Sequence, residues 1–171
     1  MKQLIIVGTA REGRNTGLVA DAVEKEFSEH HEVKVFDLKD REVPHMRKRL
    51  QYDEDPPKDV EEFSEMVEWC DMLTLVSPEY NHSIPGALKN LLDYLYSEYN
   101  GKVFSYVTVS GGGFGGVRSQ SHLHDITLAL GGRPGPNLPV SSVGEHFTEE
   151  KVSKSYNEKI SKFREKCEDF L

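Results

Sequence analysis

Short apolar segments alternate with amphipathic segments along most of this chain, and this alternation is the strongest constraint on its fold. Short apolar runs bounded by glycine or polar residues are typical of buried strands, and apolar residues three and four positions apart are typical of helices. The expected strands cover residues 3–8, 33–37, 72–77, 103–109 and 139–143. The expected helices cover residues 18–27, 59–69, 86–98, 117–130 and 149–170, the last with Thr148 as its N-cap.

Strands that alternate with helices form a mostly parallel sheet with helices on both faces. We therefore predict an α/β fold with a doubly wound sheet of five strands in the common order 2-1-3-4-5, within a single domain of 171 residues. The proline-rich and charged segment 38–58 is predicted to be an extended excursion with at most a short helix. In this strand order the loops after strands one and three flank one crevice, and the loop after strand four borders it.

The first of these loops, residues 8–17, carries hydroxyl, amide and guanidinium groups directly before a helix. Such donors, together with the positive end of a helix and its free N–H groups, suit a phosphate. The candidates are Thr9, Arg11, Arg14, Asn15 and Thr16. The alternative is an ordinary helix cap with solvated arginines. Gly8 and Gly13 have the spacing of a P-loop, but Arg14 and Asn15 stand where lysine and serine or threonine are required, so an NTPase is a minor alternative.

The second loop joins a buried strand to an amphipathic helix within residues 77–94. Its candidate residues are Pro78, Glu79, Tyr80 and Asn81, which offer an aromatic ring and more donors and acceptors than a simple connection needs. Pro85 lies near the first helical turn, where a proline is tolerated. Asp37, at the end of the second strand, is expected to close that strand or cap the next turn rather than bind a ribose.

The third loop, residues 110–116, is rich in glycine. Its candidates are Ser110, Gly111, Gly112 and Gly113, where missing side chains let backbone N–H groups approach a flat ligand. The alternative is a flexible turn. The Gly-x-Gly-x-x-Gly spacing follows the fourth strand rather than the first, so it is not a dinucleotide fingerprint. A phosphate seat, an aromatic wall and a glycine wall around one crevice suit a phosphorylated planar heterocycle such as FMN.

Charge and composition limit the classes of molecule that this chain is expected to bind. The formal net charge of −8 argues against a nucleic-acid partner. No apolar run approaches the roughly 20 residues that cross a bilayer, and the N-terminus has the pattern of a first strand rather than a signal peptide, so we expect no membrane insertion. Cys70 and Cys167 have no metal-like spacing and are expected to be reduced thiols of a cytoplasmic protein with no metal site.

Three motifs carry a resemblance to a known family. The segment Pro78-Glu-Tyr-Asn-His-Ser-Ile-Pro-Gly86, followed by Leu88-Lys-Asn90 and Asp93, resembles the signature loop of the NADPH-dependent FMN reductases. These are flavodoxin-like flavoproteins that include quinone, chromate and azo reductases. Gly8-Thr-Ala-Arg11 with Gly13-Arg14 resembles their phosphate loop, with Thr9 in place of the commoner serine, and Ser110–Arg118 is similar to their third loop. The resemblance covers about residues 3–145.

The resemblance implies a single flavodoxin-like FMN-binding domain over residues 1–171. It implies an oxidoreductase that passes hydride from NADPH or NADH to bound FMN and then to a quinone, azo, metal-oxyanion or flavin acceptor. The phosphate would be held by the first loop, the ring and ribityl chain by Pro78 to Asn81, and the pyrimidine side by Ser110 to Gly113. No side chain is expected to be catalytic, and His82 and Ser83 would shape the loop or a subunit contact.

Family members form homodimers, so a homodimer or a dimer of dimers is implied. The apolar third helix, with Leu91, Leu92, Leu95, Tyr94 and Tyr96, is the expected contact surface because its apolar width exceeds what one core face needs. The alternative function is an electron carrier, or a flavin-binding module, without nicotinamide turnover.

Overall fold

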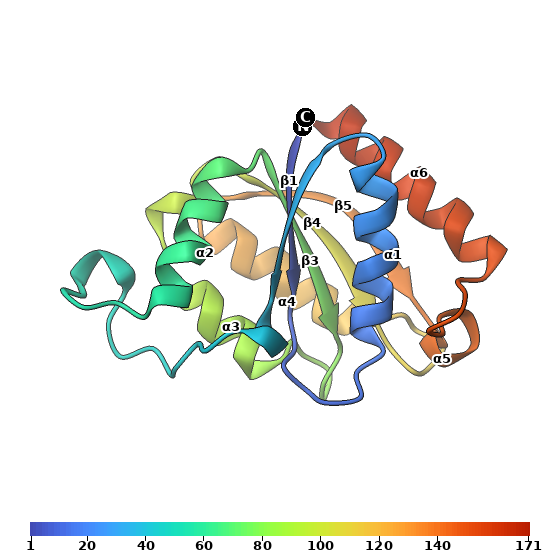
Figure 1. Ribbon diagram of the computed structural model, residues 1–171, viewed down its shortest axis with the longest axis horizontal. Helices are drawn as coiled ribbons and strands as arrows, with labels where there is room; N and C mark the ends of the chain where they lie inside the picture. The colour runs from blue at the N-terminus through green and yellow to red at the C-terminus, as the bar shows by residue number, and fades with distance from the viewer.

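The computed structural model describes residues 1–171, and its centre is one sheet of five parallel strands (Figure 1). The strands are β1 (Lys2–Val7), β2 (Glu32–Asp37), β3 (Met72–Pro78), β4 (Val103–Val109) and β5 (Arg133–Val140). The helices are α1 (Thr16–Ser28), α2 (Lys58–Trp69), α3 (Gly86–Asp93), α4 (Val117–Ala129), α5 (Val143–His146) and α6 (Lys154–Phe170), with 3-10 turns at Leu38–Asp40, Leu50–Tyr52 and Ser97–Tyr99. The order β2-β1-β3-β4-β5, with every pair parallel, confirms the predicted fold.

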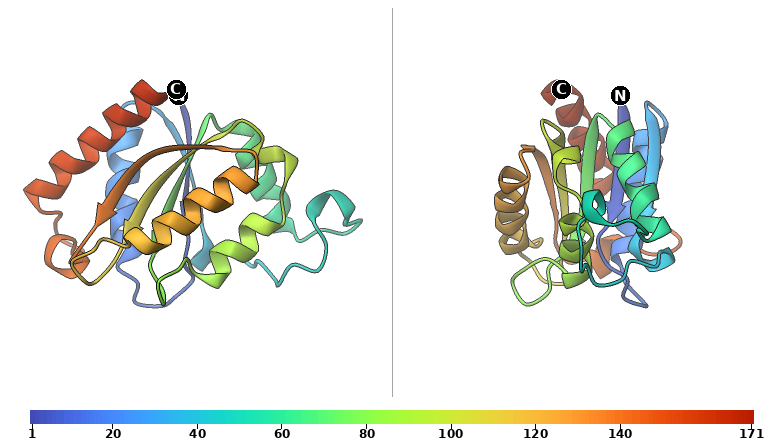
Figure 2. Two further views of the ribbon diagram at one scale, coloured as in Figure 1. Left: turned by 180° about the vertical axis from the view of Figure 1, so that it is seen from behind. Right: turned by 90° about the vertical axis from the view of Figure 1, so that its left-hand side faces the viewer.

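Helices cover both faces of the sheet. One apolar core joins α1 and α6 to the sheet through residues such as Val23 and Phe163, and a second joins α2, α3 and α4 through residues such as Phe63, Leu91 and Leu123. Seen from behind, α4 lies in front of the strands and α1 behind them (Figure 2). Since both faces are covered, every residue of β3 and β4 is buried. None of the helices has the length and apolar character needed to cross a bilayer.

The C-terminal elements begin at different residues from those predicted. Strand β5 covers Arg133–Val140 rather than 139–143, because prolines at its start hide the strand pattern and an edge strand tolerates them. Helix α6 begins at Lys154, with Ser153 in the N-cap position, rather than at residue 149. Thr148 forms a turn instead, and its hydroxyl accepts the N–H of Lys151 at 3.2 Å.

The excursion between β2 and α2 contains only two short 3-10 turns, as predicted, and it packs on α3. The carbonyl of Pro44 accepts the side-chain N–H of Asn90 at 2.7 Å and the hydroxyl of Tyr94 at 3.0 Å. The N–H of Leu50 donates to the carbonyl of Tyr94 at 2.9 Å. Helix α3 itself ends at Asp93 rather than at residue 98.

The apolar width that predicted a subunit contact on this helix is therefore used inside the chain. Leu91, Leu92, Tyr94 and Leu95 are all at most 3% exposed, and of the named side chains only Tyr96 is exposed, at 47%. The basis for choosing α3 as a contact surface was wrong, because the excursion covers the face that appeared free in the sequence.

Candidate functional site

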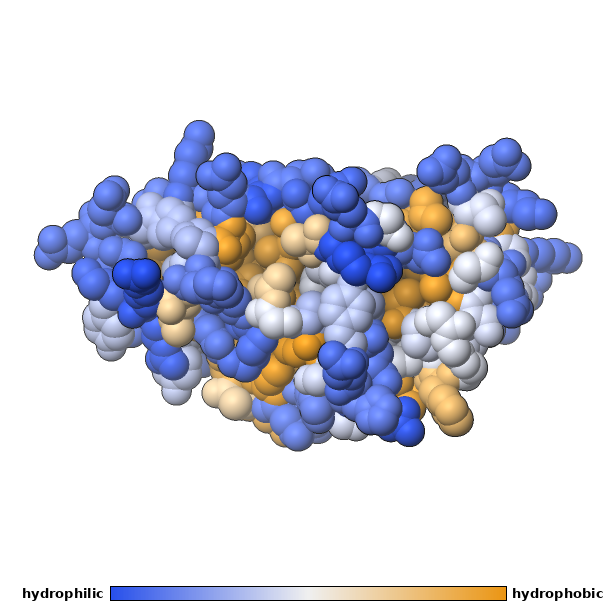
Figure 3. Space-filling model, turned by 90° about the horizontal axis from the view of Figure 1, so that it is seen from below, coloured by the Kyte–Doolittle hydropathy of each residue, from blue (hydrophilic) through white to orange (hydrophobic).

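The loops after β1, β3 and β4 meet at the carboxyl edge of the sheet, the lower edge in Figure 1. Thr9 Oγ1 and the Tyr80 hydroxyl share a hydrogen bond of 2.9 Å, and the Arg11 guanidinium lies 5.8 Å from the centre of the Tyr80 ring. Figure 3 looks onto this edge and shows apolar atoms in hollows near its centre, with polar side chains forming the rim. The structure thus brings the first two predicted loops into direct contact.

The first loop leaves the start of α1 open. Gly8 donates its N–H to the carbonyl of Val76 at 2.9 Å, and a Cβ at this position would lie 2.8 Å from the end of the Leu88 side chain, which would have to shift. The N–H groups of residues 12–17 donate to no acceptor within the protein. Asn15 occupies the N-cap position without a side-chain capping bond, so the alternative of an ordinary helix cap does not hold. Open N–H groups at a helix start are the basis of an anion site.

The two arginines of this loop differ in their surroundings. Arg14 is 8% exposed, and its guanidinium donates to the carbonyl of Thr9 and to the carboxylate of Asp37. Asp37 also accepts the N–H of Lys39 at 2.9 Å, which confirms that it caps the next turn. Arg11 is exposed and forms no ion pair. Arg14 therefore braces the loop against β2, while Arg11 is the cation left for a ligand.

A second acid, Asp21, lies behind this loop. The pKa of Asp21, on α1, is raised, first by burial and then by the charge of Asp37, with Arg14 acting in the opposite direction. The single guanidinium of Arg14 thus faces two carboxylates. Its charge is balanced within the protein, which is a further reason to treat it as structural support for the loop.

The second loop contains a tight turn with strained backbone. Tyr80 and Ser83 exchange two backbone hydrogen bonds of 2.9 and 3.0 Å. The residues between them, Asn81 and His82, have φ values of 51° and 65°, as in a type I′ turn. Each left-handed residue other than glycine costs about 1 kcal/mol, and such strain gathers at ligand sites. Both side chains are exposed, so they remain available at the rim.

This turn is fastened to α4 by a contact that the sequence did not indicate. The Ser83 hydroxyl and Nδ1 of His122 lie 2.8 Å apart in a hydrogen bond. Because His122 lies 39 positions after Ser83 in the chain, no local sequence pattern indicates that the two residues pair. Pro78 is the last residue of β3, and its side chain is buried. It can therefore contribute to the candidate site only through its backbone.

Glu79 connects the second loop to the third. Its side chain is 13% exposed and accepts the N–H groups of Arg118 and Ser119, in the first turn of α4, at 3.1 and 3.3 Å. Sequence reasoning placed Glu79 in the wall of the pocket, whereas in the structure its carboxylate is directed to the start of a helix.

The glycines of the third loop fall into two groups. Gly115 and Gly116 have φ values of 62° and 75°, and a Cβ on them would lie 2.8 Å from Pro139 and 3.0 Å from Thr108, so the fold itself requires glycine. Residues 111–113 have no left-handed φ, and a Cβ on any of them would meet no atom within 4 Å. Nothing inside the chain explains these three glycines. A Cβ on any of them would enter open space, so their backbone is accessible to a flat ligand.

The Ser110 end of this loop is held by short hydrogen bonds. The Ser110 hydroxyl donates to the carbonyl of Gly112 at 2.9 Å, and the N–H of Ser142 donates to the same carbonyl at 2.9 Å. Ser142 has a φ of 46°, so the segment leading into α5 is also strained. These bonds fix the carbonyl of Gly112 toward the protein.

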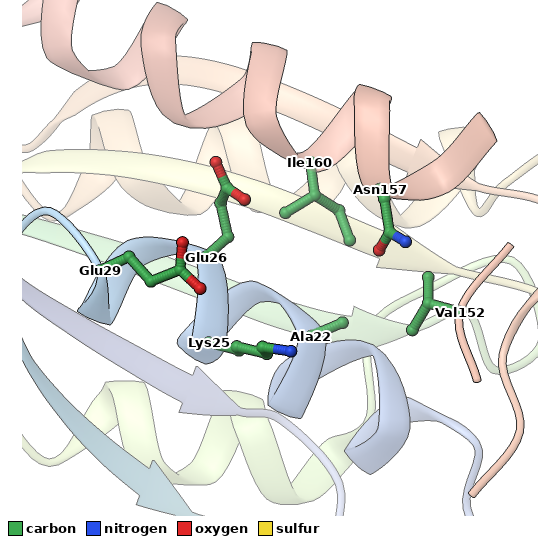
Figure 4. Close-up of a pocket in the computed structure, with 7 residues that line it drawn as sticks. All are labelled: Ala22, Lys25, Glu26, Glu29, Val152, Asn157 and Ile160. Carbon is green, nitrogen blue, oxygen red and sulfur yellow. The ribbon is translucent and has the colours of Figure 1, made fainter. Parts of the chain in front are cut away.

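Other candidate centres lie away from these loops. A cavity of about 290 Å³ between α1 and α6 shares no residue with them (Figure 4). Its lining is Ala22, Lys25, Glu26, Glu29, Val152, Asn157 and Ile160. Cys70 and Cys167 are free, as expected, and the structure also buries both, which raises the pKa of each thiol to about 12. Neither thiol is a nucleophile at neutral pH.

Comparison with known proteins gives concordant results. The family model for NADPH-dependent FMN reductase matches residues 1–146, which leaves out α6. An NADPH azoreductase from Bacillus sp. (strain OY1-2) is 34% identical over 128 residues, which are 72% of this chain and 67% of that protein. A quinone reductase from Escherichia coli (strain K12) is 32% identical over 134 residues, which are 76% and 71% of the two chains.

Among solved structures, a flavoenzyme NAD(P)H:acceptor oxidoreductase from Paracoccus denitrificans superposes with a TM-score of 0.78. Its identity is 21%, and the superposition covers 99% of this chain and 98% of that one. At this identity the likeness bears on the fold alone, and it agrees with the doubly wound sheet.

Proposed function

The chain belongs to the NADPH-dependent FMN reductase family, and we propose from its three loops which residues hold the FMN and which molecules it reduces. The protein is an FMN-dependent oxidoreductase that uses NAD(P)H. The observation that supports the proposed site is the contrast within the glycine loop, where residues 111–113 have no internal reason to be glycine and face open space. The open helix start of α1 lies on the same edge of the sheet.

The FMN phosphate belongs, in this proposal, at the start of α1. Arg11 supplies the charge, the N–H groups of residues 12–17 supply donors, and Asn15 and Thr16 add side-chain polar groups. Thr9 and Arg14 set the shape of the loop, since Thr9 is bonded to Tyr80 and Arg14 to Asp37. The donor set of one free guanidinium and a row of amides fits a phosphate dianion.

The ring and ribityl chain belong between the second and third loops. The backbone of Pro78 to Asn81 forms one wall, and Ser110 to Gly113 form the other, where the absence of side chains allows N–H groups to approach a flat ring. Tyr80 closes the phosphate end through its bond to Thr9. The exposed amide of Asn81 is suited to the polar edge of the ring.

Bound FMN supplies the redox chemistry, taking hydride from a nicotinamide and returning electrons to an acceptor. The chain's own residues bind and orient it, and the N–H groups of the glycine loop stabilise negative charge on its pyrimidine side. No side chain of the three loops is assigned a catalytic role, and both cysteines are buried away from them as neutral thiols.

We propose small aromatic electron acceptors, quinones first and azo compounds second, as the substrates. The support is the naming of the two relatives as a quinone reductase and an azoreductase, together with the open rim of the site. Metal oxyanions and free flavin belong to the same proposal, with NADPH or NADH as donor. The electron-carrier alternative is disfavoured, because the relatives are named as enzymes.

The proposed assembly is a homodimer, or a dimer of dimers, formed through α4 instead of α3. Phe114, Val117 and Leu128 are 73%, 44% and 55% exposed, and all three belong to α4 or to the loop before it. Leu128→Glu is expected to give a monomer by light scattering, whereas the wild type gives a dimer. A wild-type monomer at micromolar concentration contradicts the assembly and leaves the proposed flavin site untouched.

A single flavodoxin-like FMN-binding domain over residues 1–171 and a cytoplasmic location complete the proposal. The support for the location is the pair of free cysteines, which are typical of a reducing compartment.

The test of the function is direct. Purified protein with saturating FMN is expected to retain a yellow flavin and quench its fluorescence, and NADPH or NADH is expected to bleach it without oxygen. A panel of quinone, azo and oxyanion acceptors should then restore the colour at different rates. Absence of FMN binding overturns the proposal, and binding without bleaching by either nicotinamide favours the electron carrier.

A further inference from the structure

Helix α4 has no capping side chain of its own. Its N-cap residue is Gly116, in the left-handed conformation, and no side chain within the glycine loop accepts its first N–H groups. The acceptor comes instead from the neighbouring loop, where Oε2 of Glu79 lies 3.1 Å from the N of Arg118 and 3.3 Å from the N of Ser119. The helix that follows the glycine loop is thus capped by the second loop.

The Glu79 end of this link is fixed. The N–H of Glu79 donates to the carbonyl of Val109 at 3.0 Å, so its backbone is held at the point where β3 and β4 end. Its side chain is 13% exposed, which leaves little freedom for another orientation. The carboxylate therefore spans from the root of the second loop to the end of the third, the two loops proposed to enclose the flavin ring.

The link also carries a charge. A helix start has a partial positive charge of about half a unit, and the carboxylate offsets it. The Arg118 guanidinium is 3.9 Å from Glu79 but is 50% exposed, so solvent screens much of its effect. Arg11 belongs to the first loop and makes no ion pair with Glu79. The carboxylate therefore places a negative charge where the second loop meets the start of α4, beside the proposed ring site, and reduced flavin bears more negative charge than oxidised flavin.

We propose that Glu79 is a positioning residue that holds the glycine loop against the second loop and, through its charge, lowers the reduction potential of bound FMN. This inference rests on the proposed function. It assigns to Glu79 a role through α4 and through the local field, in addition to the wall formed by its backbone.

Three variants test it. Glu79→Gln keeps an oxygen that can accept the α4 N–H groups and loses only the charge, whereas Glu79→Ala loses both. Asp71→Asn is the matched control, because Asp71 also accepts a backbone N–H, from Lys2 at 2.7 Å, at the opposite end of β3. Both isosteric changes raise the net charge equally, but Asp71 is about 25 Å further along the strand direction.

The expected result separates the two roles. Glu79→Gln should bind oxidised FMN about as tightly as the wild type and reduced FMN about tenfold more tightly, a rise of about 30 mV in the two-electron potential. Asp71→Asn should leave the potential unchanged. Glu79→Ala should raise the potential similarly and also speed hydrogen exchange at the amides of Arg118, Ser119 and the glycine loop in the FMN-free protein.

Any of three results overturns the inference. An unchanged potential in Glu79→Gln removes the electrostatic role, and unchanged hydrogen exchange in Glu79→Ala removes the positioning role. Equal shifts in Glu79→Gln and Asp71→Asn also count against it, because they reduce the effect to net charge. A wild-type protein that binds no FMN is a different outcome, since it ends the proposed function itself.

Discussion

The starts of α1 and α4 lie at the same edge of the sheet, each after a loop, and the protein uses them in opposite ways. The start of α1 has no side-chain cap, and the N–H groups before it donate to no protein acceptor. The start of α4 receives the carboxylate of Glu79. One helix start is left for an outside anion and the other is filled by the protein's own anion. A helix start is therefore a ligand site only where the surrounding loops leave it open.

The largest expected effect concerns the glycine loop that leads into α4, the helix whose start is capped by Glu79. Gly115→Ala should lower the free energy of unfolding by about 3 kcal/mol, because it combines a left-handed φ of 62° with a Cβ 2.8 Å from Pro139. Gly112→Ala should leave stability unchanged or slightly higher while weakening FMN binding, since its Cβ enters open space. Denaturant unfolding measures the stability of both variants, and titration with FMN measures their affinity. Equal destabilisation by the two variants would contradict the separation of Gly115 from the glycines at 111–113.

The next effect concerns the open start of α1. Arg11→Ala should weaken FMN binding by about 2 kcal/mol, or roughly thirtyfold, because it removes a charge-assisted bond to the phosphate. Riboflavin, which lacks the phosphate, should bind the variant as it binds the wild type. Fluorescence titration with both flavins checks this, and an equal loss for both would mean that Arg11 does not contact the phosphate.

Arg14 should behave differently from Arg11. Arg14→Ala should lower the free energy of unfolding by about 1.5 kcal/mol, because the guanidinium is 8% exposed and bonded to Asp37. Arg11→Ala should leave that free energy nearly unchanged, since Arg11 is exposed. Thermal and urea unfolding of the FMN-free protein compare the two. If Arg11→Ala is the more destabilising change, the roles of the arginines have been exchanged.

The smallest effect is a pH dependence behind the same loop. The pKa of Asp21 is raised from 3.8 by burial and by Asp37, so the folded protein holds this proton more tightly than the unfolded chain. The carboxyl therefore costs stability as pH rises through its folded pKa, and this cost is absent below pH 3.8. Asp21→Asn should stabilise the protein at pH 7 by less than about 0.5 kcal/mol, since the group is largely exposed. A stabilisation that persists at pH 3 would show another cause.

Local patterns in the sequence were sufficient for the sheet order, for most element positions and for the three loops of the candidate site. Apolar periodicity reports which residues are buried, and parallel strands end at one edge, so these features follow from short segments taken separately. The prediction failed where prolines hid β5 and where Thr148 was taken as a helix start.

The tertiary structure decided the pairings between distant segments. Arg11 and Arg14 look equivalent in the sequence, and only the placement of β2 beside β1 brings Asp37 to Arg14. The capping of α4 by Glu79, the bond between Ser83 and His122, and the cover of α3 by the excursion have the same origin. A polar side chain has several acceptable partners in a free chain. Which one it meets depends on the packing of elements far apart in sequence, and local patterns contain no record of that packing.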